Sequence, residues 1–140
     1  MDATSPTTFE EHPTRLADGL SARATAAWGA LLVGLGVALG AFGAHTLQDL
    51  VTPARLNTFE TAVRYQVYQG LGLMLLSLFA RQGRGAPRAA LAVLLGCLVF
   101  CGSLYLLVAG GPAFLGAIAP VGGAAMIGGW LVAAWRFARA

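Results

Sequence analysis

The sequence predicts an all-α protein, an integral membrane four-helix bundle, and three observations lead to this fold class. Of the 140 residues, 57% are hydrophobic and only 11% are charged, whereas a soluble domain usually carries about 25% charged residues. The apolar residues fall in long blocks and lack the helical or strand period that would turn a polar face to water. Several blocks are long enough for a helix that crosses the roughly 30 Å hydrocarbon layer. Lipid is therefore the expected solvent.

Residues 1–23 are predicted to form a polar tail in the cytoplasm. They hold all but two of the six acidic residues, together with Ser, Thr and Pro. Such a segment cannot bury enough apolar surface to order itself, so we expect it to be disordered. It lacks a charged start followed at once by an apolar core and a cleavage site, which argues against a signal peptide.

Residues 24–137 are predicted to form the membrane domain, with spans at about 24–45, 58–80, 89–109 and 120–137. The first span carries no charge. Asn57 can cap the second helix, because Glu60 follows three residues later in a capping-box arrangement. The connection 81–88 consists of turn formers and arginines. Pro120 suits the first turn of the fourth helix, where its missing N–H would be unpaired anyway.

The positions of the arginines predict the orientation. With four spans, one side of the membrane receives Arg15, Arg23, Arg81, Arg84, Arg88, Arg136 and Arg139, and the other side only Arg55 and Arg64. Cytoplasmic flanks collect Lys and Arg, so both termini should be cytoplasmic in a multi-pass protein of a bacterial inner (plasma) membrane. The tryptophans Trp28, Trp130 and Trp135 are then expected near the cytoplasmic interface, where amphipathic rings prefer to lie.

Small residues recur at helical spacing on the first and fourth spans, which predicts close helix packing. One stripe on the first span ends on a histidine, so we expect His45 to point into the bundle. A second set of small residues lies on another side of the same span. The predicted packing positions are Gly34, Ala38, Ala41, Gly36, Gly40, Gly128 and Gly129.

Uncharged polar side chains gather in the half of the spans that lies away from the cytoplasm, and they form a candidate polar cluster. Its members are His45, Tyr65, Gln66, Gln69 and Ser103. An ionisable residue inside a membrane is a functional hypothesis by default, but His45 could equally hydrogen-bond a loop carbonyl. Tyr65 and the glutamines could serve as interhelical hydrogen bonds. Glu60 and Arg64, four residues apart, are predicted to form an interfacial ion pair.

Several function classes are not expected. The basic residues are scattered, so no nucleic-acid-binding face is visible. Cys97 and Cys101 share one helix face without a nearby histidine, which predicts buried small hydrophobes and no metal site. A haem would ordinarily want an axial histidine with suitable partners, and only His45 is offered in the spans. The usual nucleophile and acid-base constellations are incomplete. We therefore expect no cofactor and no enzymatic activity.

Four stretches together resemble a known family. In order they are "GAFGAHTL", "FETAVRYQVYQGLGL", "GSLYLL" and "PVGGAAMIGGWL", and they are similar to the small four-span inner-membrane proteins of domain-of-unknown-function 423, the YgdD-like family. The resemblance implies a four-helix membrane protein and supplies no established activity. In the family pattern the position of Gln69 is often histidine. Glutamine keeps hydrogen bonding but loses proton titration and most metal affinity, so the two-histidine arrangement is missing here.

Two functions remain open from the sequence. The first is a structural or accessory protein whose partners, besides the lipid bilayer, are further copies of itself or a larger membrane complex, contacted through its small-residue faces. The second is a small-solute transporter or channel that uses the candidate polar cluster. A water-accessible cavity reaching His45 favours transport, whereas a dry, fully packed bundle favours the accessory role.

Overall fold

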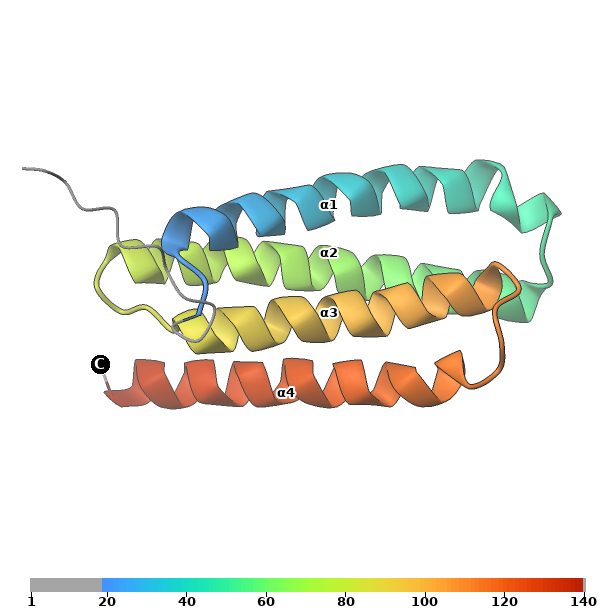
Figure 1. Cartoon of the computed structure of the whole chain (residues 1–140). Helices are drawn as coiled ribbons and strands as arrows, with labels where there is room; N and C mark the ends of the chain where they lie inside the picture. The colour runs from blue at the N-terminus through green and yellow to red at the C-terminus, as the bar shows by residue number, and fades with distance from the viewer. Residues whose placement is uncertain (1–18, 140) are drawn as a thin grey trace, which may run out of the picture.

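A computed structural model describes residues 19–139, which form four α-helices and one short 3-10 helix, with no strand in this range. The elements are α1 (Ala22–His45), η2 (Leu47–Asp49), α2 (Pro53–Arg81), α3 (Pro87–Val108) and α4 (Leu115–Arg139). The helices run antiparallel and lie side by side in chain order (Figure 1). The all-α four-helix bundle is confirmed. The predicted disorder of the N-terminal tail falls mostly on residues 1–18, which lie outside the described residues.

The helices begin earlier than the sequence predicts, because other residues cap them. The Ser21 hydroxyl accepts a hydrogen bond from the backbone N–H of Ala24 over 3.2 Å and caps α1. On α2 the cap is Thr52, with Pro53 in the first turn. The predicted cap Asn57 was wrong: it lies inside α2, and its carbonyl accepts from the Thr61 hydroxyl. A Thr-Pro start satisfies one orphan N–H and removes another.

The predicted start of the fourth helix at Pro120 was also wrong. The helix α4 begins at Leu115, whose N–H donates to the carbonyl of Pro112 over 3.1 Å. Pro120 therefore lies one turn inside α4. There its ring removes the hydrogen bond that would reach the carbonyl of Gly116, and such a proline bends or strains a helix.

Glycines with left-handed backbone end α2 and α3. Gly83 has φ 81° and Gly110 has φ 96°. After α3, the N–H of Gly110 donates to the carbonyl of Leu107 and the N–H of Gly111 to that of Leu106, which is the Schellman arrangement. The connection after α2 repeats this pattern around Gly83. These two ends fix the turns that return the chain into the bundle.

The bundle consists of two tight helix pairs, α1 with α2 and α3 with α4, joined where α2 packs on α3. In the first pair, a Cβ placed on Gly29 would lie 2.6 Å from the carbonyl oxygen of Gly70. In the second, a Cβ on Gly96 would lie 2.7 Å from the carbonyl oxygen of Gly122. Only glycine allows backbones to approach this closely in a membrane. Within residues 19–139, α1 and α4 do not approach each other.

Three of the helices, α1, α3 and α4, are long and apolar enough to span a membrane. The second helix is not among them; it carries Arg55, Glu60, Arg64 and Arg81, and Gln66 and Gln69 lie among its apolar residues. It carries no charge over residues 65–80 and runs the length of the bundle between its neighbours (Figure 1). Large apolar side chains such as Val37, Leu75 and Leu131 are exposed on the outside. Such a surface suits lipid and not water.

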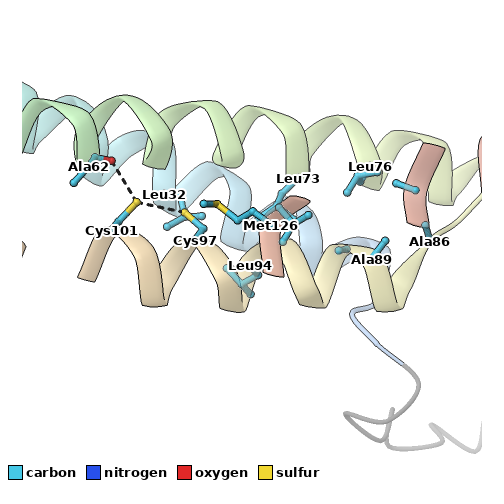
Figure 2. Close-up of a cluster of buried hydrophobic side chains, with 13 residues drawn as sticks. Leu32, Ala62, Leu73, Leu76, Ala86, Ala89, Leu94, Cys97, Cys101 and Met126 are labelled. Atoms are coloured by element: carbon cyan, nitrogen blue, oxygen red, sulfur yellow. Dashed lines mark hydrogen bonds between the residues drawn. The ribbon is translucent and has the colours of Figure 1, made fainter. Parts of the chain in front are cut away.

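The centre of the bundle is apolar and closely packed (Figure 2). Leu73 of α2 and Val93 and Cys97 of α3 are fully buried. Both cysteines are free and buried, as predicted. The thiol of Cys101 donates to the carbonyl of Ala62 over 3.3 Å, which adds a weak link between α2 and α3.

Candidate functional site

Gln66, on the inner face of α2, is one of two buried residues among the polar ones predicted to form a site; like Ser103, it is 5% exposed. Its Nε2 donates to the carbonyl oxygen of Leu32 on α1 over 2.9 Å. Its Oε1 accepts from the hydroxyl of Tyr105 on α3 over 2.8 Å. One amide therefore links three helices, which is the interhelical hydrogen-bonding alternative considered from the sequence.

Gln69 makes the corresponding link to α4. Its Oε1 accepts a hydrogen bond from the indole Nε1–H of Trp130 over 2.7 Å. The Trp130 ring lies directly on Gly72, where a Cβ would collide with it. The Trp130 ring therefore turns inward, where Gly72 leaves room and Gln69 provides an acceptor, while its depth near the cytoplasmic interface stays a prediction.

A groove lies beside this contact, between α2 and α4 with α3 behind it. Its volume is about 630 Å³. Its lining residues are Tyr65, Gln69, Phe100, Gly123, Met126, Ile127, Trp130, Leu131 and Ala134. The rings of Tyr65 and Phe100 lie 5.0 Å apart between centroids. We call it the α2–α4 groove; it is mostly apolar, with the Gln69 amide and the Tyr65 hydroxyl as polar groups.

A second, smaller hollow lies on the other side of the α2–α3 pair, between α1 and α3. Its volume is about 400 Å³, and Leu32, Gln66, Cys97 and Tyr105 are among its lining residues. The polar atoms of Gln66 and Tyr105 already bond to each other there. This hollow therefore offers little besides apolar surface.

The structure does not bring the predicted polar cluster together. His45 is exposed at the end of α1, so the prediction that it points into the bundle was wrong; the buried side of this last turn is Gly43. Ser103 is buried but donates to the Phe100 carbonyl of its own helix over 2.9 Å. Of the five predicted residues, only Tyr65 and Gln69 share a groove.

The predicted ion pair between Glu60 and Arg64 is not formed in the structure. Both side chains are exposed. Arg64 Nη2 instead donates to the hydroxyl of Thr61 over 3.2 Å. Exposed pairs at this spacing gain only a few tenths of a kcal/mol, about 0.3–0.5, so a neighbouring hydroxyl competes easily.

The small residues divide into an inner and an outer set, and the sequence predicted both as helix-packing positions. Gly36 and Gly129 are buried, and a Cβ on Gly40 would lie 3.5 Å from a Val63 methyl. Gly34 and Gly128 instead face outward, where a Cβ would meet nothing within 4 Å. Two neighbours of Gly34 on the same stripe, Ala38 and Ala41, are also exposed. Packing of this outer set inside the chain was therefore a wrong prediction, since α1 turns its Gly29, Gly36 and Gly43 side to α2.

The polar groups of the described residues are mostly engaged in hydrogen bonds. Residues 19–139 contain no group of three or more His, Cys, Asp or Glu side chains that could hold a metal ion. Among them, every buried side-chain nitrogen or oxygen has a hydrogen-bond partner. The fully buried polar atoms of these residues thus bond within a helix or between helices of the bundle.

Sequence reasoning missed Tyr105 and Trp130 as partners of the glutamines. Both residues were visible in the spans, but the helix-to-helix pairing depends on rotation of each helix about its axis, and α4 begins earlier than predicted. Gly29 and Gly70 were missed as well. The signal for α1 was present, because Gly29, Gly36 and Gly43 repeat at an interval of seven, which keeps them near one helix face.

The fold and its interhelical links define an integral membrane four-helix bundle. Residues 39–123 match the family described as "Protein of unknown function (DUF423)", and the chain belongs to this family. A UPF0382 membrane protein of Staphylococcus haemolyticus is 39% identical over 105 residues, covering 74% of this chain and 86% of that protein. The UPF0382 membrane protein YwdK of Bacillus subtilis is 37% identical over 107 residues, with 74% and 87% covered. No solved structure matches the chain.

Proposed function

We propose that this protein is a non-catalytic component of the bacterial inner (plasma) membrane that acts by associating with further copies of itself or with a larger membrane complex. The observation that carries the proposal is the outward set of small residues. A Cβ on Gly34 of α1 or Gly128 of α4 would meet nothing within 4 Å, and Ala38 and Ala41 are exposed, so within residues 19–139 no helix covers them. In lipid, helices associate through such surfaces because close backbone approach increases van der Waals contact.

The polar groups support an accessory role over solute passage. Gln66 and its partner Tyr105 are occupied by hydrogen bonds between helices, and Gln69 holds Trp130. Neither of the two larger grooves is lined by His45. These hydrogen bonds hold the helices of the bundle together, and its outer surface remains available to partners.

The orientation proposed here places both termini in the cytoplasm. Arg81 and Arg84 lie at the same end of the bundle as Arg136 and Arg139. These four arginines therefore mark one end of the bundle. The guanidinium of Arg136 donates to the carbonyl of Gly85 over 3.4 Å, and that of Arg139 lies 4.2 Å from the Trp135 ring centroid. Arginine-rich ends stay on the cytoplasmic side of bacterial membranes.

Crosslinking in native membranes followed by affinity purification tests the association. We expect a crosslinked band with a second copy or a reproducible membrane partner, and its loss in Gly34→Leu or Gly128→Leu. The matched control is Leu35→Ile, which changes an exposed residue of α1 about 100° around the helix from Gly34. A chain that remains monomeric in its native membrane, or bands unchanged by both glycine variants, would contradict the proposal.

A second candidate is a small-solute transporter or channel, and the α2–α4 groove is the observation that favours it. The groove reaches the Gln69 amide about halfway along α2. Osmotic swelling of proteoliposomes in glycerol tests uncoupled passage. Accelerated swelling that Gln69→Leu abolishes would support this candidate, and swelling equal to that of empty liposomes would exclude glycerol passage.

A further inference from the structure

The Gln69 amide has a fixed orientation that leaves two hydrogen-bond donors unused. An indole N–H can only donate, so the atom 2.7 Å from Trp130 Nε1 must be the amide oxygen. The Nε2 group then points away from Trp130. Within residues 19–139 no atom accepts a hydrogen bond from it. Since every buried polar atom there has a partner, this Nε2 is open to the groove that Gln69 lines.

The unused N–H groups of Gln69 lie within a helix of the bundle, and they indicate that a hydrogen-bond acceptor is missing. Gln69 lies five residues after Arg64 and twelve before Arg81, which is about 8 Å and 18 Å along the helix. An amide N–H without an acceptor in an apolar environment keeps the full cost of its lost hydration. Lipid acyl chains in the groove would leave this cost in place, whereas a carbonyl oxygen would remove it.

The walls of the groove favour a flat ring. Tyr65, Phe100 and Trp130 contribute three aromatic side chains around the amide. Met126, Ile127 and Leu131 supply the remaining apolar surface, and methionine adapts to rings of varied outline. The volume of about 630 Å³ lies within the range of sites for small organic molecules, roughly 300–1,000 Å³.

We propose that the α2–α4 groove is a binding site for a membrane-dissolved molecule with a planar, carbonyl-bearing ring and an apolar tail, the chemistry of a quinone. The Gln69 Nε2 donates to the ring carbonyl, and the Tyr65 hydroxyl provides a second polar contact at the same wall. The aromatic side chains contact the ring faces, and the tail leaves toward lipid between α2 and α4. This site is independent of the association proposed above.

Tryptophan fluorescence tests the site directly, because Trp130 forms its wall. The variant Trp28→Phe, Trp135→Phe leaves Trp130 as the single tryptophan, which is excited selectively over the three tyrosines at long wavelength. The probe is a benzoquinone with a short isoprenoid tail, titrated into the full chain in lipid nanodiscs. We expect saturable quenching that Gln69→Leu weakens by roughly tenfold, the order of one hydrogen bond. A tail-matched hydrocarbon without the ring should not displace the probe.

A second pair of variants keeps the test informative if Gln69→Leu disturbs the Trp130 contact. Gly123→Leu fills part of the groove away from the amide, since Gly123 lies seven residues, or about 10 Å, along α4 from Trp130, and a Cβ there is 3.8 Å from the Phe100 ring. Ala124→Leu is the matched control, because Ala124 is exposed and does not line the groove. We expect saturable quenching in the control and its loss in Gly123→Leu.

Linear quenching, equal in all variants, would overturn the proposal, because the quinone would then only be dissolved in the lipid. Lipids with brominated acyl chains provide a further check, because they quench Trp130 when an acyl chain lies in the groove. If this quenching is saturable and the quinone does not relieve it, acyl chains occupy the groove and the proposal is overturned.

Discussion

The hydroxyl of Tyr105 donates to the Oε1 of Gln66 over 2.8 Å, while the Nε2 of the same amide donates to the carbonyl of Leu32 over 2.9 Å. Three helices therefore meet at one buried side chain. Hydrogen bonds inside a membrane have no water to compete with them, yet they contribute only about 0.6 kcal/mol on average because the unfolded chain in lipid also finds partners. The contact sets the rotation of α2 relative to its neighbours.

The Gln66–Tyr105 contact can be measured with a double-mutant cycle. We expect Gln66→Leu to lower the free energy of unfolding by about 1–2 kcal/mol, since it leaves the Tyr105 hydroxyl without its acceptor and removes the second hydrogen bond to the Leu32 carbonyl. Tyr105→Phe should cost less, because it removes a single bond. The coupling between the two should be about 0.6 kcal/mol, read from unfolding in mixed micelles. Fully additive effects would mean that the bond does not form.

The glycine crossings provide the sharpest stability comparison. We expect Gly70→Ala and Gly96→Ala each to lower the free energy of unfolding by about 1–3 kcal/mol, because each new Cβ would meet the backbone of the facing helix. Gly34→Ala is the matched control, since its Cβ meets nothing within 4 Å. Its stability should be unchanged or raised, because alanine favours helix. Equal losses at all three positions would contradict the packing described here.

The two glycines that end α2 and α3 should resist substitution for a different reason. A Cβ meets no atom at Gly83 or Gly110, but both have positive φ. Gly83→Ala and Gly110→Ala should therefore each cost about 1–2 kcal/mol of unfolding free energy through backbone strain alone. The control is Gly102→Ala, which also adds a Cβ in open space but has no positive φ. A loss at Gly102 equal to the others would point to packing instead of strain.

His45 gives a negative expectation. Its side chain is exposed at the end of α1 and lies outside the α2–α4 groove. His45→Ala should therefore change the melting temperature and the unfolding free energy little, within about 0.5 kcal/mol, and should leave the crosslinked band intact. A large loss of either stability or association would show that the histidine has a role that its exposure does not indicate.

The sequence was sufficient for the fold and insufficient for the rotation of the helices. Long uncharged blocks such as residues 24–45 predict α1 almost to its ends, because lipid requires every backbone group to bond within the helix. Gly34 and Gly36 look alike in the sequence, yet one faces outward and the other packs on Val67. On a helix with two stripes of small residues, either stripe could pack against a neighbouring helix, and only the three-dimensional structure shows which one does.

The site was harder to predict for a related reason. Grouping polar residues by depth placed Gln66 and Gln69 together, but adjacent turns of α2 point them at different helices. Gln66 faces Tyr105 of α3, and Gln69 faces Trp130 of α4. Depth in the membrane is a one-dimensional property, whereas a binding site depends on which side of each helix is turned inward.

The most direct test concerns the proposed arrangement, in which four helices cross the membrane and both termini lie in the cytoplasm. Single cysteines are introduced as Gln82→Cys, in the α2–α3 connection, and as Gln48→Cys, between α1 and α2, in a chain with Cys97→Ala and Cys101→Ala. Both new positions are exposed. With a membrane-impermeant maleimide, we predict labelling of position 48 in cells whose cytoplasmic membrane is intact, and of position 82 only after that membrane is permeabilised. Labelling of position 82 in intact cells, or of both positions from the same side, would contradict the account.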